Sequence, residues 1–307
     1  MNTKPLVSFC ISTYKRPEIL SKQLKLLLQQ THSDFFIVIS DNDPESSGKK
    51  VIEQINDSRI QYYPNGENIG IIKSFNKSIE RSVTEYVVMV TDDDPLQINF
   101  LEEIIPLIKN YPGYSMYSGF LINKKSQIEI INKNEFPVFV LDPDKNPSIF
   151  WSNCVLRKFD VIKIGMIHDY GSPHLIDHAL LTMVGSENGC VIKNAVYSSH
   201  FLHDNNYSRS NFDSYFVGCV GFYKILSAYF GSYKNKKIEK VIKKHLKSWF
   251  IAISFSLRRF FKEDKNKIKE IDLFSDKILH LDFMKSSRFK YFAKKKIFAV
   301  KVFLKLV

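Results

Sequence analysis

The first third of the chain alternates between two hydrophobic patterns. Short apolar runs with β-branched and aromatic residues predict strands, and segments with an apolar residue every three or four positions predict helices. The predicted strands cover residues 7–12, 35–40, 60–63 and 86–91. The predicted helices cover residues 19–30, 51–56, 71–82 and 99–110. Strands that alternate with helices in this way favour a parallel sheet in an α/β domain.

The pattern becomes weaker after residue 114. It predicts strands over 117–122, 138–141 and 191–197 and a helix over 177–184. From residue 212 onward it predicts helices alone. We therefore expect an α/β domain over 1–211 and a helical C-terminal region over 212–307.

The charge is distributed unevenly between these two regions. The net charge of the chain is +12, and residues 234–307 contain 22 Lys and Arg against 7 Asp and Glu. Such a basic tail suggests an anionic partner surface, either membrane lipid or nucleic acid. No recognisable nucleic-acid-binding module accompanies the charge, so we favour lipid and expect no nucleic acid.

The last residues of the tail carry a more specific pattern. In a helix over 286–307, Lys290, Lys294, Lys301 and Lys305 would form a narrow stripe beside a broad apolar face. This combination is typical of a helix that lies in a membrane interface. The alternative is a helix that packs its aromatic side chains on the protein and leaves its lysines in solvent.

The four cysteines are widely spaced and form no CxxC pair. We expect them to be reduced and buried, as in a cytoplasmic protein. Residues 1–12 show no secretory signal pattern, which agrees with that expectation.

Three consecutive acidic residues, Asp92, Asp93 and Asp94, follow the strand predicted over 86–91. Like charges at one place need a compensating cation, and carboxylate oxygens suit Mg²⁺ or Mn²⁺. In open α/β sheets, ligands bind beyond the carboxyl ends of the strands, where these residues fall. The alternative is a solvated acidic turn that caps the helix after Pro95.

Four segments together resemble the family 2 glycosyltransferases. They are 7–17 (VSFCISTYKRP), 40–42 (SDN), 68–70 (NIG) with Asn76, and 91–94 (TDDD). The resemblance extends from about residue 5 to 210 and is strongest to bacterial enzymes of O-antigen and capsule assembly, such as the abequosyltransferase-like group. It implies a GT-A fold, in which a Rossmann-like, mostly parallel sheet is flanked by helices.

The resemblance also implies a function. The chain would be an inverting, metal-dependent enzyme that moves a sugar from UDP or another nucleoside diphosphate to a glycan or a polyprenyl-diphosphate-linked glycan. It would act at the cytoplasmic face of a bacterial membrane, as a peripheral protein.

The same resemblance assigns residues to the nucleotide. Thr13, Tyr14 and Arg16 would hold the base, while Asp41 would accept a hydrogen bond from a pyrimidine imide or contact the ribose. Asn68 and Gly70 would form the next loop of the site, and Lys73 would meet a phosphate. The alternatives are an Asx turn at Asp41 and a solvated side chain at Lys73.

The resemblance leaves two registers open for the aspartates. In the first, Asp93 binds the metal, Asp92 lies near the ribose, and Asp94 lies near the metal or the acceptor. In the second, Asp92 and Asp94 are the key pair. Strand alternation favours the first, because Asp93 would point away from its two neighbours. His203, whose spacing suits the family better than that of His200, would reach the diphosphate or the metal.

The candidate general base is Asp177, which matches the family's catalytic aspartate at the start of a helix. The chain departs from the family at Ile176, where a second acid is usual. The alternative for Asp177 is an ordinary aspartate at a helix N-terminus.

Two other functions remain open at this stage. A nucleotidyltransferase would also need a nucleotide site with acidic metal ligands, although the turn at 13–17 lacks a glycine-rich phosphate loop. A non-catalytic sugar-nucleotide-binding protein at the membrane surface would fit the tail and the missing acid at Ile176.

Overall fold

The computed structural model describes residues 4–91, 95–120, 127–144, 151–198, 209, 211–231 and 235–303. The chain divides into two compact units. The first contains residues 1–140, 145–169 and 176–202, and the second contains 141–144, 170–175 and 203–307.

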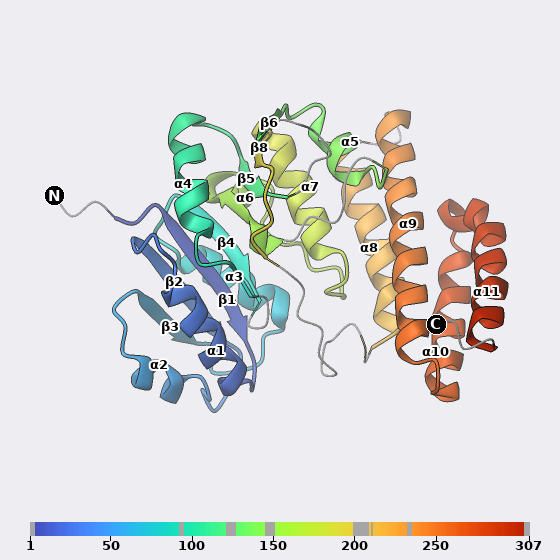
Figure 1. The fold of residues 1–307 in the computed structure, drawn as a ribbon, viewed down its shortest axis with the longest axis horizontal. Coiled ribbons are helices and arrows are strands. Elements are labelled where there is room, and N and C mark those ends of the chain that lie inside the picture. Colours follow the sequence, from blue (N-terminus) through green and yellow to red (C-terminus); the bar gives the residue numbers. More distant parts are fainter. Residues whose placement is uncertain are drawn as a thin grey trace. The chain divides into compact units, whose positions relative to one another are not determined.

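The first half of unit 1 alternates strictly between strands and helices (Figure 1). The strands are β1 (Val7–Thr13), β2 (Phe35–Asp41), β3 (Ile60–Pro64) and β4 (Tyr86–Val90). The helices are α1 (Pro17–Leu28), α2 (Lys49–Ile55), α3 (Ile71–Arg81) and α4 (Phe100–Asn110). All eight elements agree with the prediction to within a few residues at each end, so the alternation read from the sequence is confirmed.

The second half of unit 1 has shorter elements. Its strands are β5 (Met116–Gly119), β6 (Ile128–Ile131), β7 (Cys154–Arg157) and β8 (Cys190–Lys193). Its helical segments are α5 (Phe136–Leu141), η1 (Trp151–Asn153), α6 (Lys158–Lys163) and α7 (Ile176–Asn188). The last residue of α5 belongs to unit 2.

The predicted strands 117–122 and 191–197 overlap β5 and β8, and the predicted helix 177–184 lies within α7, but one prediction for this half needs correction. The strand predicted over 138–141 is wrong, because these residues belong to α5. Pro137 is tolerated there because the first turn of a helix needs no N–H from it. Phe136 is fully buried against Gly185 of α7, where an added Cβ would lie only 2.2 Å from the Phe136 ring. The sequence prediction also missed β6, β7 and α6.

The strands form one sheet in the order β3-β2-β1-β4-β7-β5-β8-β6. β2, β1 and β4 are paired in parallel, as are β2 with β3 and β5 with β8. β7 runs antiparallel to β4 and β5, and β6 runs antiparallel to β8. The sheet is therefore mostly parallel, as predicted.

Helices cover both faces of this sheet. Phe9 and Ile11 share a core with Leu20 and Leu24 of α1, and all four side chains are fully buried. On the opposite face, Cys10 is hydrogen-bonded to Ser78 of α3. Since successive residues of a strand point to opposite faces, β1 separates these two layers and is itself wholly buried.

Unit 2 is helical, as predicted for the end of the chain. It contains α8 (Asp213–Phe230), α9 (Lys236–Phe260), α10 (Lys265–Leu279), the short η3 (Asp282–Ser287) and α11 (Arg288–Phe303). Its core is built from aromatic side chains exposed by at most 2%, namely Phe222, Phe250, Phe274 and Tyr291. Within the described residues, no helix is both apolar and long enough to cross a bilayer.

The four cysteines, Cys10, Cys154, Cys190 and Cys219, are free and buried, as expected. Burial raises the pKa of each thiol, to about 12 for Cys10 and for Cys154. They are therefore weak nucleophiles in the folded protein.

Candidate active site

The parallel pairing brings the ends of β1 and β2 together at one edge of the sheet. Thr13, the last residue of β1, is the register partner of Asp41, the last residue of β2. Asp41 is in turn the register partner of Pro64 at the end of β3. The backbone N–H of Asn42 donates to the carbonyl of Thr13 at 2.9 Å, which extends the pairing beyond the strands. The first two predicted nucleotide segments thus lie side by side.

The turn after β1 presents an aromatic ring at this edge. Tyr14 is 41% exposed, and the Lys15 ammonium lies 5.5 Å from the centre of its ring. Lys15 has a φ of 53°, which bends the chain sharply. Arg16 is the N-cap of α1, and its carbonyl accepts the N–H of Leu20 at 3.0 Å. An exposed ring on a fixed turn is a suitable platform for a nucleobase.

Asp41 is fully buried, and its carboxylate accepts hydrogen bonds from the protein itself. Oδ1 accepts the N–H of Asp43 at 2.9 Å, and Oδ2 accepts the N–H of Gly48 at 3.1 Å and the hydroxyl of Tyr62 at 2.6 Å. Burial and the Asp41 carboxylate raise the pKa of Tyr62, so its hydroxyl stays protonated as a donor. The Asx turn that competes with a base-binding role is therefore present, and Asp41 fixes the shape of the loop 42–48.

A polar network lies next to Asp41 that the sequence pattern did not predict. The side-chain amide of Asn65 donates to Ser40 Oγ and to Asn42 Oδ1, both at 2.9 Å. Arg81, from the last turn of α3, reaches Asn65 Oδ1 at 3.3 Å and lies 4.8 Å from the centre of the Tyr63 ring. No motif spacing marks these residues, because the tertiary packing of α3 on β2 brings them together.

The loop into α3 is shaped by Asn68 and Gly70. Asn68 Oδ1 accepts the N–H of Gly70 at 3.0 Å, and Gly70 has a φ of 84°, a conformation that favours glycine. Lys73, in the first turn of α3, is exposed. Asn76 exchanges two hydrogen bonds with the backbone of Ile167, at 2.9 and 3.0 Å, and so ties α3 to the loop after α6.

Asp177 lies at the same edge of the sheet by topology. It is in the first turn of α7, which ends at Asn188, two residues before β8 begins. β8 is parallel to β5, so the end of α7 lies at the amino ends of these strands. Because α7 has 13 residues and is about 20 Å long, its first turn lies near the carboxyl ends. Burial raises the pKa of Cys154, and the Asp177 carboxylate adds to the rise. Cys154 begins the antiparallel β7, which places it at this edge too.

The Asp177 side chain is 31% exposed, and Oδ2 lies 3.8 Å from Nε2 of His178. Ile176, at the position where a second acid was expected, is 4% exposed and belongs to the core. Asp177 is thus an accessible carboxylate at a helix start, next to an apolar neighbour.

Two other segments meet beside the end of β4. Leu96 forms an antiparallel bridge with Ser198, and the N–H of Gln97 donates to the carbonyl of Tyr197 at 2.7 Å. The Ser198 hydroxyl is 3.0 Å from that of Ser152 in η1. The segments 95–98 and 197–198 therefore lie next to each other.

The candidate metal ligands Asp92, Asp93, Asp94 and His203 lie outside the described residues, as does His200. Within the described residues, no three His, Cys, Asp or Glu side chains are grouped to hold a metal ion. The assignment of metal ligands therefore stays a prediction.

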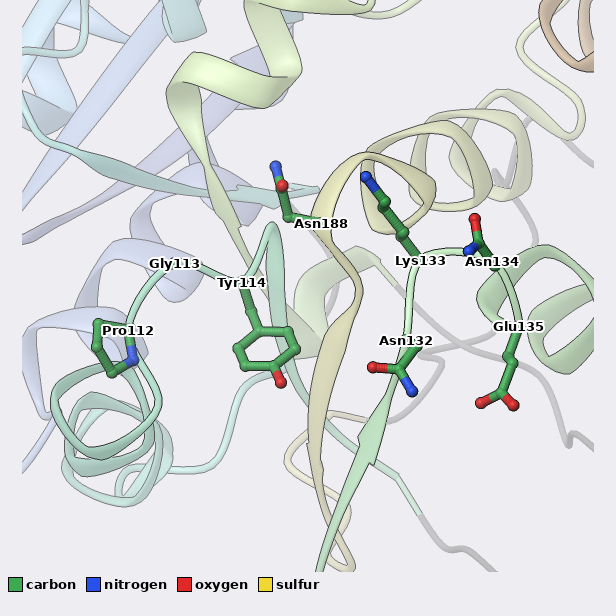
Figure 2. Close-up of a pocket in the computed structure, with 8 residues that line it drawn as sticks. All are labelled: Pro112, Gly113, Tyr114, Asn132, Lys133, Asn134, Glu135 and Asn188. Atoms are coloured by element: carbon green, nitrogen blue, oxygen red, sulfur yellow. The ribbon is translucent and has the colours of Figure 1, made fainter.

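A separate hollow of about 630 Å³ lies at the opposite edge of the sheet (Figure 2). Tyr114 precedes β5, Asn132 follows β6 and Asn188 ends α7, so this hollow is at the amino ends of β5 and β8. Its lining is exposed apart from the half-buried Tyr114, and it contains none of the predicted site residues.

Parts of the chain are similar in sequence to known glycosyltransferases. The uncharacterized glycosyltransferase MJ1057 of Methanocaldococcus jannaschii is 32% identical over 35% of this chain and 38% of its own length. The GalNAc(5)-diNAcBac-PP-undecaprenol beta-1,3-glucosyltransferase of Campylobacter jejuni is 26% identical over 40% of this chain and 41% of its own length. The match thus spans about two-fifths of these relatives.

Solved structures share the fold at low sequence identity. Residues 1–349 of S. aureus TarS, also solved with UDP-GlcNAc, superpose with a TM-score of 0.60 at 13% identity, covering 86% of this chain and 76% of that one. The mannosyltransferase PcManGT of Pyrobaculum calidifontis, solved with GDP-Man and Mn²⁺, superposes with a TM-score of 0.58 at 11% identity, covering 95% and 87%. The expected GT-A fold is confirmed.

The sequence profile described as Glycosyl transferase family 2 matches residues 8–165. This segment is just over half of the chain and runs from β1 to the end of α6. The chain belongs to glycosyltransferase family 2.

Proposed function

We propose that the protein is an inverting glycosyltransferase that moves a sugar from a nucleoside diphosphate to a hydroxyl of a glycan acceptor. The observation that carries this proposal is the shared edge of the sheet. There, Thr13 is paired with Asp41, the Tyr14 ring is exposed, and Asp177 opens α7. A nucleotide platform and an accessible carboxylate on one edge are what such a transfer requires.

In the proposed reaction the base rests against Tyr14 and the loop that Asp41 fixes. The acceptor oxygen bonds to the anomeric carbon from the side opposite the diphosphate, while the bond from that carbon to the phosphate oxygen breaks. Asp177 takes the proton of the acceptor hydroxyl, and the nucleoside diphosphate leaves. One in-line displacement of this kind inverts the anomeric centre.

A divalent cation, Mn²⁺ or Mg²⁺, belongs to the same proposal. Asp93 and Asp94 with His203 are the residues proposed to hold it, and Asp92 is assigned to the ribose side. Three consecutive carboxylates supply the oxygen ligands that these ions prefer. When bound, the cation would neutralise the negative charge of the diphosphate. PcManGT, of the same fold, has been solved with Mn²⁺.

A lipid-linked acceptor is also part of the proposal. The C. jejuni relative is named for an undecaprenol-linked acceptor, and the match to it covers 40% of this chain. An acceptor of that kind would hold the enzyme at the inner surface of a bacterial membrane, and we propose this location.

The deciding experiment measures sugar transfer and nucleotide release from a panel of labelled nucleotide sugars. We expect Asp177→Asn to lower turnover by about 10²–10⁴-fold, the range for a general base, with donor affinity unchanged. The matched control is Asp213→Asn, because Asp213 also lies in the first turn of a helix, α8. Asp213→Asn should retain wild-type turnover, and equal loss in both variants would contradict the assignment of Asp177.

The same assay separates the alternative functions. Release of nucleoside diphosphate supports glycosyl transfer, whereas release of pyrophosphate would indicate a nucleotidyltransferase. Tight binding of a nucleotide sugar without turnover for any acceptor would indicate a non-catalytic protein. Chelation of divalent cations should abolish transfer and Mn²⁺ should restore it; activity that survives chelation would contradict the metal assignment.

A further inference from the structure

The last described helix of unit 2, α11, packs through one face only. Tyr291 is 2% exposed, and its ring lies 5.3 Å from that of Phe250 and 5.5 Å from that of Phe255, both on α9. Arg258 donates to the Tyr291 hydroxyl at 2.7 Å. Phe298, two turns further along, lies 5.9 Å from the ring of Phe255. This face anchors α11 to its unit.

The opposite face of α11 is apolar and exposed. We call Phe289, Phe292, Ile297 and Val300 the apolar ridge; their exposed fractions are 87%, 48%, 57% and 56%. Phe289, Ala293, Ile297 and Val300 are spaced by four, four and three residues, so they follow one line along the helix. Phe289 and Tyr291 are two residues apart and therefore point in nearly opposite directions. The exposed Lys296 lies between Phe292 and Val300 on the same side, so the ridge is apolar with one lysine in it; exposed apolar side chains grouped in this way indicate a binding partner.

Lysines run along the side of this ridge. Lys290, Lys294 and Lys301 are exposed and lie on one line, because they are separated by four and seven residues. α11 contains one arginine and five lysines and no acidic residue. The partner must therefore accept both apolar side chains and a row of cations.

We propose that the apolar ridge of α11 docks on an anionic lipid surface. The ridge would enter the boundary between headgroups and acyl chains, while the lysines contact the headgroup phosphates. A second copy of the chain fits poorly, because two ridges face to face would bring like charges together. Nucleic acid would accept the lysines but leave the Phe289 ring in water. This inference rests on α11 alone and does not depend on the proposed transfer reaction.

The sequence alone left two options for this helix, either membrane contact or packing on the protein. The two faces make these options compatible, because Tyr291 and Phe298 pack while Phe289 and Ile297 stay exposed. α11 would thus be held rigidly by its unit and present a preformed docking face.

The test is flotation of the full chain with vesicles of phosphatidylcholine, with or without phosphatidylglycerol. We expect binding to the anionic vesicles, weakened by salt because exposed charges are screened. The double variant Phe289→Ser with Ile297→Ser should bind at least about tenfold more weakly, since each side chain contributes apolar burial. The double variant Lys290→Gln with Lys301→Gln should bind the anionic vesicles more weakly at low salt, by about fivefold in affinity for each lysine.

Matched controls carry the same changes elsewhere. Lys265→Gln with Lys269→Gln removes two exposed lysines from α10, and Phe159→Ser removes a phenylalanine of unit 1 that is 69% exposed. Both controls should float like the wild type. Equal losses in the controls, or no flotation of the wild type, would overturn the proposal.

Four further measurements keep the result interpretable. Circular dichroism should show unchanged helix content in the ridge variant; if that variant fails to fold, the lysine pair and Val300→Ser decide the outcome. Sedimentation velocity that finds a wild-type dimer broken by Phe289→Ser would assign the ridge to self-association instead. Displacement of the protein from vesicles by duplex nucleic acid would likewise overturn the lipid assignment. Donor hydrolysis should be equal in all variants, so membrane docking and catalysis are tested separately.

Discussion

Gly48 offers the sharpest test of the sheet edge where Thr13 and Asp41 meet, because it has no room for a side chain. A Cβ added to Gly48 would lie 2.8 Å from Asp41 Oδ2, 3.2 Å from Leu20 Cδ2 and 3.2 Å from Tyr62 Cε2. The backbone of Gly48 is in the right-handed helical region, with φ −68° and ψ −22°. Any penalty of Gly48→Ala therefore comes from these contacts and not from backbone strain.

The magnitude follows from what must move. At a compatible backbone position, Gly→Ala alone would stabilise the fold by about 0.4–1 kcal/mol. Here Asp41 is fully buried and held by three hydrogen bonds, so relief of the clash weakens at least one of them, at a cost of about 1–3 kcal/mol. Overpacking against Leu20 adds about 1–3 kcal/mol. We expect a net destabilisation of about 2–4 kcal/mol.

The assay is urea unfolding followed by tryptophan fluorescence. The chain has two tryptophans, Trp151 in unit 1 and Trp249 in unit 2. A Trp249→Phe background therefore reports the unfolding of unit 1 alone. Lys49→Ala, one residue away at an exposed position, is the control and should change stability by less than about 0.5 kcal/mol. If Gly48→Ala is as stable as the wild type, Asp41 does not hold the loop rigidly and the reasoning is refuted.

Other predictions follow from single contacts. The pKa of His174 is lowered to about 4 by burial, so the folded state binds fewer protons than the unfolded state between about pH 4 and 6.5. The free energy of unfolding should therefore fall as the pH falls through this window. In urea unfolding at several pH values, the free energy of unfolding of His174→Phe should depend less on pH than that of the wild type. Tyr14→Ala should weaken binding of the nucleoside diphosphate by about 5- to 100-fold in calorimetry without changing stability, and an unchanged affinity would exclude base stacking there. Asn76→Ala removes both hydrogen bonds to Ile167 and should cost about 1–3 kcal/mol in urea unfolding; a neutral result would show that α3 is anchored elsewhere. Cys10 and Cys154 should react with a thiol reagent only when guanidinium unfolds the chain, and rapid labelling of the native protein would contradict their burial.

The first half of unit 1 was predictable because β1, β2 and β4 are buried along almost their whole length and read as continuous apolar runs. β1 and β2 are seven residues each, and the pattern of β1 is apolar apart from Ser8 and its polar end. The second half was predictable only in part: β5, β8 and α7 were found, but β6 and β7 were missed, because strands of four residues are too short to establish a period. The misassigned run at 138–141 contains two valines, which favour a strand by propensity, although it lies in α5, where Phe136 packs on Gly185.

The candidate site was likewise predictable only in part. Motif order predicted the edge where Thr13, Asp41 and Asp177 lie, because strand ends and helix starts follow directly from the element assignment. Tyr62, Asn65 and Arg81 were missed, because their contacts with Asp41 and Ser40 span 21 to 41 residues and arise from packing. Loop geometry such as the closed turn of Asp41 likewise depends on partners that spacing does not reveal.

The inverted strand β7 has a consequence for how this protein is synthesised. β4 pairs with β1 on one side. On its other side it pairs with β7, which begins only at Cys154. On the ribosome, the apolar β4 (YVVMV) would emerge and pair long before its second neighbour exists. During that interval it is an open, uncharged sheet edge, the kind that recruits strands from other chains. We therefore expect fragments that stop before β7 to aggregate more readily than the full chain.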